Sequence, residues 1–423
     1  MISEKVTCWA MGRIERCRFV TWERRSDDPD LLTLTNLWPH REKPAYGPFV
    51  RASVDGLEAR GLRSDVLFIR GYMGPLAYLY GALIVMLLRV AKRDYPLVHA
   101  HGGETALIAR LYRGAPVVAS YLGSDLLAPQ EGGWRLRMKC RVQSAILRRH
   151  AVLMTATTTK THEMEAKLPH RARARNRVIP DGIDLDHFAP RDRRAARARL
   201  GWPSDARIVM FAGRAESPGK RLWLAREAVA IAQGELHDLE LMVVSGANPD
   251  EMPLYYSAAD CLLHTSASEG SPNVIKEALA CDLPIVATPA GDIEQLVAGA
   301  RPGVVVPADA CTLAREVVAC CREPKRSNGR SLTGGMGLAD AAEATVDLYR
   351  SLASGLGERA IIVPDRCVGN GALVTRDGPD YEIGLNPHPD HERTASTINA
   401  RGLGAGCWPC VDTADQARRA TNA

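Results

Sequence analysis

Short apolar runs alternate with longer helical stretches in two separate series, and this alternation restricts the fold more than any other feature of the sequence. The first series starts at residues 31–35 and the second at residues 208–212. Strands that alternate with helices form parallel sheets with crossover helices, and a chain of 423 residues can build two domains of ordinary size. The predicted fold class is therefore α/β, with two Rossmann-like domains.

The two series predict a first domain of residues 31–188 and a second domain of residues 200–336. Residues 1–30 are rich in charge and lack periodicity, so we expect a poorly ordered extension. Residues 337–354 are predicted to form a C-terminal helix. Residues 355–423 accumulate Pro, Gly, Asp and His, which is typical of an irregular tail.

The predicted strands are residues 31–35, 65–69, 97–101, 116–120, 152–154, 208–212, 239–244, 261–263, 284–287 and 303–307. The predicted helices are residues 48–60, 76–88, 104–113, 134–149, 221–233, 272–280, 313–322 and 338–352. Ligands of parallel sheets bind beyond the carboxyl ends of the strands. In the first domain we therefore expect a ligand near the loops at residues 38–47, 99–104 and 122–125.

The segment from His264 to Asp282 reads as strand, glycine-containing turn and helix. Pro272 fits the first helical turn, where its missing N–H would have no partner, and such a helix start suits a phosphate. Glu269 precedes this start, and Glu277 lies about two helical turns further on. One carboxylate can meet hydroxyls near the phosphate and the other can meet hydroxyls farther away, which is the layout of a nucleotide sugar. For a random pair of glutamates, a solvated helix face is the better interpretation.

The letters EGSPNVIKE followed by ALACDLPIVAT resemble the Glu-x7-Glu donor-site motif of the retaining glycosyltransferases of family 4, also called glycosyl transferases group 1. The resemblance extends over residues 31–354 and includes a match to the family's linker signature, RVIPDGIDLD. It implies a GT-B fold, with two facing domains and a cleft between them. The last helix of that family crosses back to the first domain, a role that residues 341–349 could fill. Within that family, the chain resembles the bacterial glycosyltransferases that make surface polysaccharides or teichuronic acid.

The resemblance also implies roles for individual residues. Glu269 would contact the transferred sugar and Glu277 the ribose, while Arg214 and Lys220 would bind the diphosphate. The loop is one residue longer than the commonest family spacing, so Arg221 is the alternative to Lys220. Attack would occur from the front face, with the leaving phosphate helping to deprotonate the acceptor. The donor-binding set is completed by Gly47, Gly213, Gly270, Ser271, Pro272, Asn273 and Val274.

The chain departs from the family pattern at Leu122, where many relatives carry a histidine that touches the donor sugar. Leucine cannot hydrogen-bond a hydroxyl or share a proton. His101 and Asp125 are the catalytic candidates that could take over this work, although such a histidine is more often a structural residue. We place His99 and His101 on opposite faces of their strand.

The charge, the apolar runs and the cysteines of the sequence restrict the binding partners and the cellular location that can be expected. A net charge of +5 is too mild to indicate nucleic acid. Basic clusters at residues 135–149 and 171–177 are most often solvated helix faces, but on one side of a protein they would also suit an anionic membrane surface or a phosphate-bearing acceptor. The apolar run at residues 76–88 is shorter than the roughly 20 residues of a membrane span. Scattered cysteines and the absence of a signal-peptide pattern favour the cytoplasm, with peripheral binding to the inner face of the membrane as a further expectation. The pair Cys407 and Cys410 is not expected to be redox-active.

The predicted function is metal-independent, retaining transfer of a sugar from a nucleotide-diphosphate sugar to a lipid-linked or polysaccharide acceptor. No cofactor is expected, and Asp184 and Asp186 are interpreted as part of the linker rather than as a metal motif. Two alternatives stay open. One is a nucleotide-sugar-binding protein that has lost catalysis, and the other is a nucleotide-sugar epimerase on the same architecture.

Overall fold

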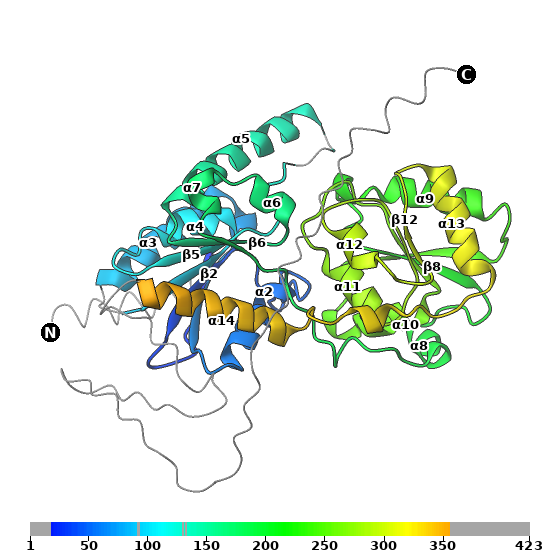
Figure 1. The fold of residues 1–423 in the computed structure, drawn as a ribbon, viewed down its shortest axis with the longest axis horizontal. Helices are drawn as coiled ribbons and strands as arrows, with labels where there is room; N and C mark the ends of the chain where they lie inside the picture. The colour runs from blue at the N-terminus through cyan, green and yellow to red at the C-terminus, as the bar shows by residue number, and fades with distance from the viewer. Residues whose placement is uncertain (1–17, 91–93, 129–130, 132, 356–423) are drawn as a thin grey trace, which may run out of the picture. The chain divides into compact units, whose positions relative to one another are not determined.

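The computed structural model describes residues 18–90, 94–128, 131 and 133–355, all of which belong to one compact unit. Two parallel sheets with their own cores define two domains (Figure 1). The first sheet has seven strands in the order β1-β3-β2-β4-β5-β6-β7, and the second has five in the order β12-β11-β10-β8-β9. The predicted α/β fold class is confirmed.

The first sheet is parallel except for β1, which pairs antiparallel with β3 at the edge. Its strands are β1 (Val20–Glu23), β2 (Leu31–Thr35), β3 (Ser64–Ile69), β4 (Leu97–His101), β5 (Val117–Ser120), β6 (Ala156–Thr159) and β7 (Asn176–Val178). Its helices are α2 (Pro48–Glu58), α3 (Pro75–Val90), α4 (Gly103–Ala109), α5 (Trp134–His150), α6 (His162–Ala166) and α7 (His170–Arg173), with short 3-10 turns at η1 (Gly71–Met73) and η2 (Ala151–Leu153).

The second domain follows the linker and contains only parallel strand pairs. Its strands are β8 (Arg207–Ala212), β9 (Leu239–Val244), β10 (Cys261–His264), β11 (Ile285–Ala287) and β12 (Gly303–Val305). Its helices are α8 (Arg193–Leu200), α9 (Leu222–Ala232), α10 (Met252–Ala258), α11 (Asn273–Ala280), α12 (Ile293–Val297) and α13 (Ala310–Arg322), with 3-10 turns at η3 (Pro218–Lys220), η4 (Pro249–Glu251) and η5 (Gly329–Leu332). The last helix is α14 (Leu338–Gly355).

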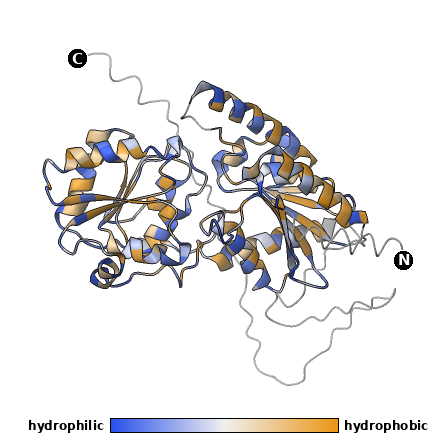
Figure 2. Ribbon diagram, turned by 180° about the vertical axis from the view of Figure 1, so that it is seen from behind, coloured by the Kyte–Doolittle hydropathy of each residue, from blue (hydrophilic) through white to orange (hydrophobic). Residues whose placement is uncertain are grey.

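Helices cover both faces of each sheet, and hydrophobic residues are found in both the strands and the helices (Figure 2). In the first domain, α3 and α4 share one core with the strands, while α14 packs on the other face beside α2. Val346 and Tyr349 of α14 are buried there with Leu31, Leu97 and Val118. The last helix of the described chain thus packs on the first domain (Figure 1).

Each sheet has a point where the strand order reverses. In the first sheet, β3 and β4 lie on opposite sides of β2, and in the second sheet, β9 and β10 lie on opposite sides of β8. Ligands of open parallel sheets bind beyond the carboxyl ends of the strands at such points. The carboxyl ends of β2, β4, β8 and β10 are therefore the places to look for a site.

The structure departs from several predictions. Val20 and Trp22 of β1 are buried, so part of the expected N-terminal extension completes the first sheet. The strand predicted at residues 152–154 is wrong, because this segment forms η2 and the strand is β6, whose ATTT sequence is less apolar but β-branched. Helices α6, α7, α8, α10 and α12 were not predicted. Residues 356–423, including Cys407 and Cys410, lie outside the described residues.

No helix among the described residues is both long and apolar enough to cross a bilayer.

Candidate functional site

The carboxyl end of β10 leads into a turn and then into α11. His264 is the last residue of the strand, and Pro272 is the N-cap residue of the helix rather than its first residue. No side chain caps this helix start in the structure. The first N–H groups of an α-helix lack partners within the helix, so this end of α11 can bind an anion.

Lys220 and Glu269 form an ion pair at this site. Lys220 Nζ donates to Glu269 Oε1 at 2.5 Å, and His264 Nε2 lies 3.5 Å from the same oxygen. Burial alone would raise the pKa of Glu269, but His264 and the charge of Lys220 outweigh it and hold that pKa well below its usual range. Burial lowers the pKa of His264, although the neighbouring Glu269 opposes this. Glu269 is therefore an anion throughout the physiological pH range.

Hydrogen bonds between two loops position Lys220 over Glu269. Thr265 Oγ1 donates to the carbonyls of Lys220 and Arg221, and Ala267 N donates to Gly219 O at 2.8 Å. The Lys220 side chain also passes close to Gly213, where an added Cβ would lie 3.5 Å from Lys220 Cδ. Gly213 has a φ of +151°, a conformation that favours glycine.

The other two cations of this loop behave differently. Arg221 Nε donates to Glu131 Oε1 at 3.0 Å and so points to a different carboxylate from Lys220. Arg214 is exposed directly after β8, and its charge acts on Tyr46 of the first domain. Among the three, Lys220 is the cation that the structure brings to Glu269.

Glu277 lies on α11 with one oxygen bound by a buried tyrosine. Tyr256 donates its hydroxyl to Glu277 Oε2 at 2.7 Å. Burial raises the pKa of Glu277, while the Tyr256 hydrogen bond and the charge of Lys276 partly oppose it. Tyr256 therefore fixes the orientation of the carboxylate that would meet the ribose.

Several polar atoms around the start of α11 are buried without a hydrogen-bond partner in the described part of the chain. They include Ser266 Oγ and Asn273 Oδ1. Such atoms cost free energy unless a ligand binds them.

The turn after β11 lies against this site, because a Cβ on Gly291 would come within 1.9 Å of Gly270 O. Burial raises the pKa of Asp292 in that turn, and the Ser271 hydroxyl partly opposes it.

In the first domain, His99 and His101 share one face of β4. Their ring centroids are 4.3 Å apart, so the prediction of opposite faces was wrong, because side chains two residues apart on a strand point the same way. His99 is a structural residue that contacts Tyr349 and Ser120. His101 is 3% exposed, and its Nε2 has no partner within the described residues. Burial lowers the pKa of His101 to about 3, so this ring is neutral.

Asp125 closes the loop that contains Leu122. Leu122 N donates to Asp125 Oδ2 at 2.9 Å. Burial raises the pKa of Asp125 to about 6, with Glu104 adding to the rise. No hydrogen bond or ion pair of the described residues joins His101 or Asp125 to the Lys220–Glu269 pair.

The raised pKa of Asp125 predicts a specific pH dependence of stability. From pH 3.8 to about 6 the folded state keeps a proton that the unfolded state has released, so stability falls as the pH rises. Asp125→Asn removes this loss. The free energy of unfolding of the variant, measured relative to that of the wild type, should therefore rise by about 2–3 kcal/mol from about pH 4 to pH 7. Urea unfolding at both pH values measures the difference. Glu104→Gln should shift the window downward, and a difference that does not change with pH would contradict the prediction.

The need for glycine at position 47 is explained by contacts within the protein. It is the N-cap residue of α2 with a φ of +75°, and an added Cβ would lie 2.7 Å from Leu37. The close approach at Gly47 is therefore to the preceding loop.

Sequence reasoning missed three residues of the site, namely Tyr256, His264 and Asp292. His264 ends β10 and Asp292 lies in the turn after β11, so the rule for parallel sheets could have found them. Tyr256 belongs to a helix that the sequence pattern did not predict, and no signal indicated it.

Comparison with known proteins gives an independent result. Residues 206–323 match the family model described as glycosyl transferases group 1. D-inositol 3-phosphate glycosyltransferase 1 of Catenulispora acidiphila is 29% identical over 329 residues, which cover 67% of this chain and 78% of the relative. The D-inositol 3-phosphate glycosyltransferase of Mycobacterium tuberculosis is 33% identical over 163 residues, covering 31% of this chain and 33% of the relative.

Solved structures share the fold. Sucrose-phosphate synthase from Thermosynechococcus elongatus has a TM-score of 0.61 at 19% identity, covering 77% of this chain and 99% of that structure. Anabaena HepE in complex with UDP and glucose has a TM-score of 0.56 at 18% identity, covering 76% and 99%. The two parallel sheets thus form the GT-B fold. The chain is a glycosyltransferase that transfers a sugar from a nucleotide sugar, and its residues 206–323 match the glycosyl transferases group 1.

Proposed function

We propose that this enzyme is a metal-independent transferase that moves a sugar from a nucleotide-diphosphate sugar to a lipid-linked or polysaccharide acceptor. The observation that carries the donor part is the Lys220–Glu269 pair beside the uncapped start of α11. A cation, an anion and free N–H groups lie together there, at the carboxyl ends of β8 and β10. The cation and the N–H groups suit a diphosphate, and the carboxylate suits the hydroxyls or the developing positive charge of a sugar.

Lys220 and the start of α11 would bind the diphosphate. One ammonium has three donors, so Lys220 can keep its bond to Glu269 while it donates to a phosphate oxygen. Arg214 is exposed and can add its planar guanidinium. Gly213, Gly270, Ser271, Pro272, Asn273 and Val274 would contribute close backbone approach and polar groups. These fixed positive groups would stabilise the leaving diphosphate, which supports the metal-independent part of the proposal.

Glu269 would act on the sugar as an anion. Its low pKa excludes a role as a proton donor, but a carboxylate can stabilise the positive charge that develops at the anomeric carbon. Glu277, oriented by Tyr256, would accept hydrogen bonds from the ribose hydroxyls. The neutral ring of His101 and the carboxyl group of Asp125 remain candidates for contact with the hydroxyl groups of the sugar or the acceptor from the first domain. Gly47 remains a donor-binding candidate only through the loop that it ends.

The donor prediction can be tested by calorimetry with a panel of UDP-, GDP- and ADP-sugars. UDP-glucose comes first, because a solved structure of HepE, which shares the fold, contains UDP-glucose. We expect one nucleotide class to bind, with slow hydrolysis that persists in EDTA. Binding without hydrolysis or transfer would favour the non-catalytic alternative, and conversion of the donor's sugar without acceptor would favour the epimerase. Failure of the whole panel to bind would contradict the donor site.

The acceptor can be identified once the donor is known. A lipid-linked acceptor, a polysaccharide and D-inositol 3-phosphate form three arms of one transfer assay, the last because the relatives are named for that substrate. We expect transfer to one of the first two. Transfer to D-inositol 3-phosphate alone would replace the acceptor part of the proposal and leave the donor part intact.

A further inference from the structure

Helix α5 combines cationic and apolar side chains on an exposed surface. It contains six Lys or Arg residues and no acidic residue in the sequence WRLRMKCRVQSAILRRH. Five of its large apolar side chains are exposed, with Trp134 the most exposed at 67%. The exposed apolar residues are Trp134, Leu136, Met138, Val142 and Ile146. A surface helix of a soluble domain normally buries its apolar residues, so α5 requires an explanation.

The inward side of α5 is known from its contacts. Leu147 packs on Gly103 of α4, Ser144 donates to Ser124 O, and Gln143 donates to Glu104. Only Ser144 and Leu147 are buried, and both lie in the second half of the helix. The first two turns, from Trp134 to Arg141, bury no side chain. This half of α5 is thus available for a partner.

Helix α3 adds a second exposed apolar stripe to the same layer of the first domain. Both α3 and α5 pack against α4. The exposed residues of α3 follow helical spacing: Leu76, Leu79, Tyr80, Leu83, Met86 and Val90. Arg89 is the one charged residue in α3. Figure 2 shows α3 as largely hydrophobic and α5 as mixed, so the cations are concentrated on α5, whereas both helices expose apolar residues.

This distribution fits a lipid surface better than a protein or nucleic acid. The centre of a protein interface is depleted of charge, whereas α5 alternates Arg135, Arg137 and Lys139 with apolar residues. Phosphate backbones attract cations but offer nothing to an exposed row of leucines. At a bilayer, apolar side chains enter the acyl boundary while Lys and Arg reach anionic headgroups. The Arg135 guanidinium lies 5.5 Å from the centre of the Trp134 ring, a pair suited to the headgroup level.

We propose that α5, extended by the exposed stripe of α3, docks the first domain on an anionic bilayer. The cations of α5 bind the headgroups, and Trp134, Met138 and Val142, which share one face of the helix at i,i+4 spacing, insert at the acyl boundary. The proposal goes beyond the sugar chemistry and does not depend on it, because docking can be measured without donor or acceptor.

Sedimentation with vesicles tests the proposal. We expect the enzyme to bind vesicles of phosphatidylglycerol and phosphatidylcholine, to bind pure phosphatidylcholine far less, and to lose binding as salt is added. Arg135→Gln with Arg137→Gln should weaken binding about 30-fold, given about 1 kcal/mol for each cation. Trp134→Ala should weaken it roughly tenfold, and Leu79→Glu in α3 should weaken it as well.

Matched controls come from the second domain. Arg194→Gln with Arg199→Gln in α8 changes the net charge equally, and Trp223→Ala in α9 removes a tryptophan that is 59% exposed. These variants should bind as the wild type does, and thermal unfolding should show that all variants fold. Equal binding to both vesicle types, or equal losses in the controls, would overturn the proposal. So would self-association without lipid that the α5 variants abolish, since a second copy would then be the partner.

Discussion

Replacing Lys220 with alanine should lower the rate of donor cleavage about 10²- to 10³-fold, the cost of removing one fixed group that stabilises developing charge. Lys220 Nζ is held on Glu269 Oε1 by a loop that Thr265 and Ala267 fasten to the β10–α11 turn. Its removal takes a cation from the diphosphate and leaves Glu269 with His264 as its neighbouring base. The measurement is the rate of nucleotide release at saturating donor.

Arg221→Ala is the matched control, since it removes an adjacent cation that pairs with Glu131 instead. Its rate should stay within about threefold of the wild type, which is less than 1 kcal/mol of barrier. Lys220→Arg should recover part of the loss because it restores the charge in a different shape. If Arg221→Ala were the slower enzyme, the diphosphate would be bound by Arg221, and the assignment of Lys220 would be wrong.

Much of the site could be predicted because its residues are close in sequence. Glu269, Pro272 and Glu277 lie within one strand-turn-helix unit, so local spacing determines their arrangement. Lys220 comes from another loop, but β8 and β10 are neighbours and their carboxyl ends meet. Tyr256 was not predictable in the same way. It reaches Glu277 from α10, and only the packing of α10 on α11 brings the two together.

The fold errors have local causes. Strand β1 was missed because it is short and follows a charged segment, yet pairing with β3 buries Val20 and Trp22. The strand at residues 152–154 was wrongly predicted because the prediction relied on apolar residues alone. Thr157, Thr158 and Thr159 are buried in β6, where hydrogen bonds such as Thr158 to Ser120 satisfy their hydroxyls. A threonine strand becomes recognisable only when its partners are known.

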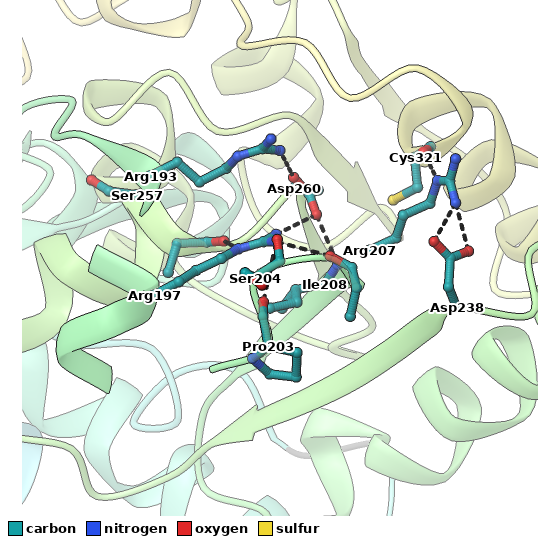
Figure 3. A network of polar contacts seen from close by, with 12 residues as sticks. Arg193, Arg197, Pro203, Ser204, Arg207, Ile208, Asp238, Ser257, Asp260 and Cys321 are labelled. Atoms are coloured by element: carbon teal, nitrogen blue, oxygen red, sulfur yellow. Dashed lines mark hydrogen bonds and ion pairs between the residues drawn. The ribbon is translucent and has the colours of Figure 1, made fainter. Parts of the chain in front are cut away.

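The arginine-rich segment at residues 191–199 illustrates the same limit. No helix was predicted for this segment, and most of α8 is exposed. Arg197, however, is buried, and its guanidinium donates to Asp260 and to the carbonyls of Ala258, Ser204 and Ala206 (Figure 3). Nothing in the local pattern distinguishes this arginine from its neighbours, because its partners lie up to 63 residues away.

Replacing Asp260 with alanine should destabilise the second domain by about 3–5 kcal/mol, the cost of leaving a buried charge without its partner. The Asp260 side chain is 2% exposed and accepts from Arg193, from Arg197 at 2.7 Å and from Ile208 N at 2.8 Å (Figure 3). It joins α8 to the starts of β8 and β10, at the opposite end of the sheet from Glu269. The effect should therefore reach activity only through unfolding.

Hydrogen exchange measures this loss for each domain separately. Amides of β8 and β10 should exchange about 10²- to 10⁴-fold faster in Asp260→Ala, while amides of β2 and β4 should be unchanged. Asp238→Ala is the control, because it breaks the pair with Arg207 in which Asp238 is 44% exposed, and exchange in this variant should change little. Asp260→Asn should lie between them, since the amide keeps one acceptor for Arg197 but loses the charge. Equal losses in Asp260→Ala and Asp238→Ala would show that burial does not set the strength of this network.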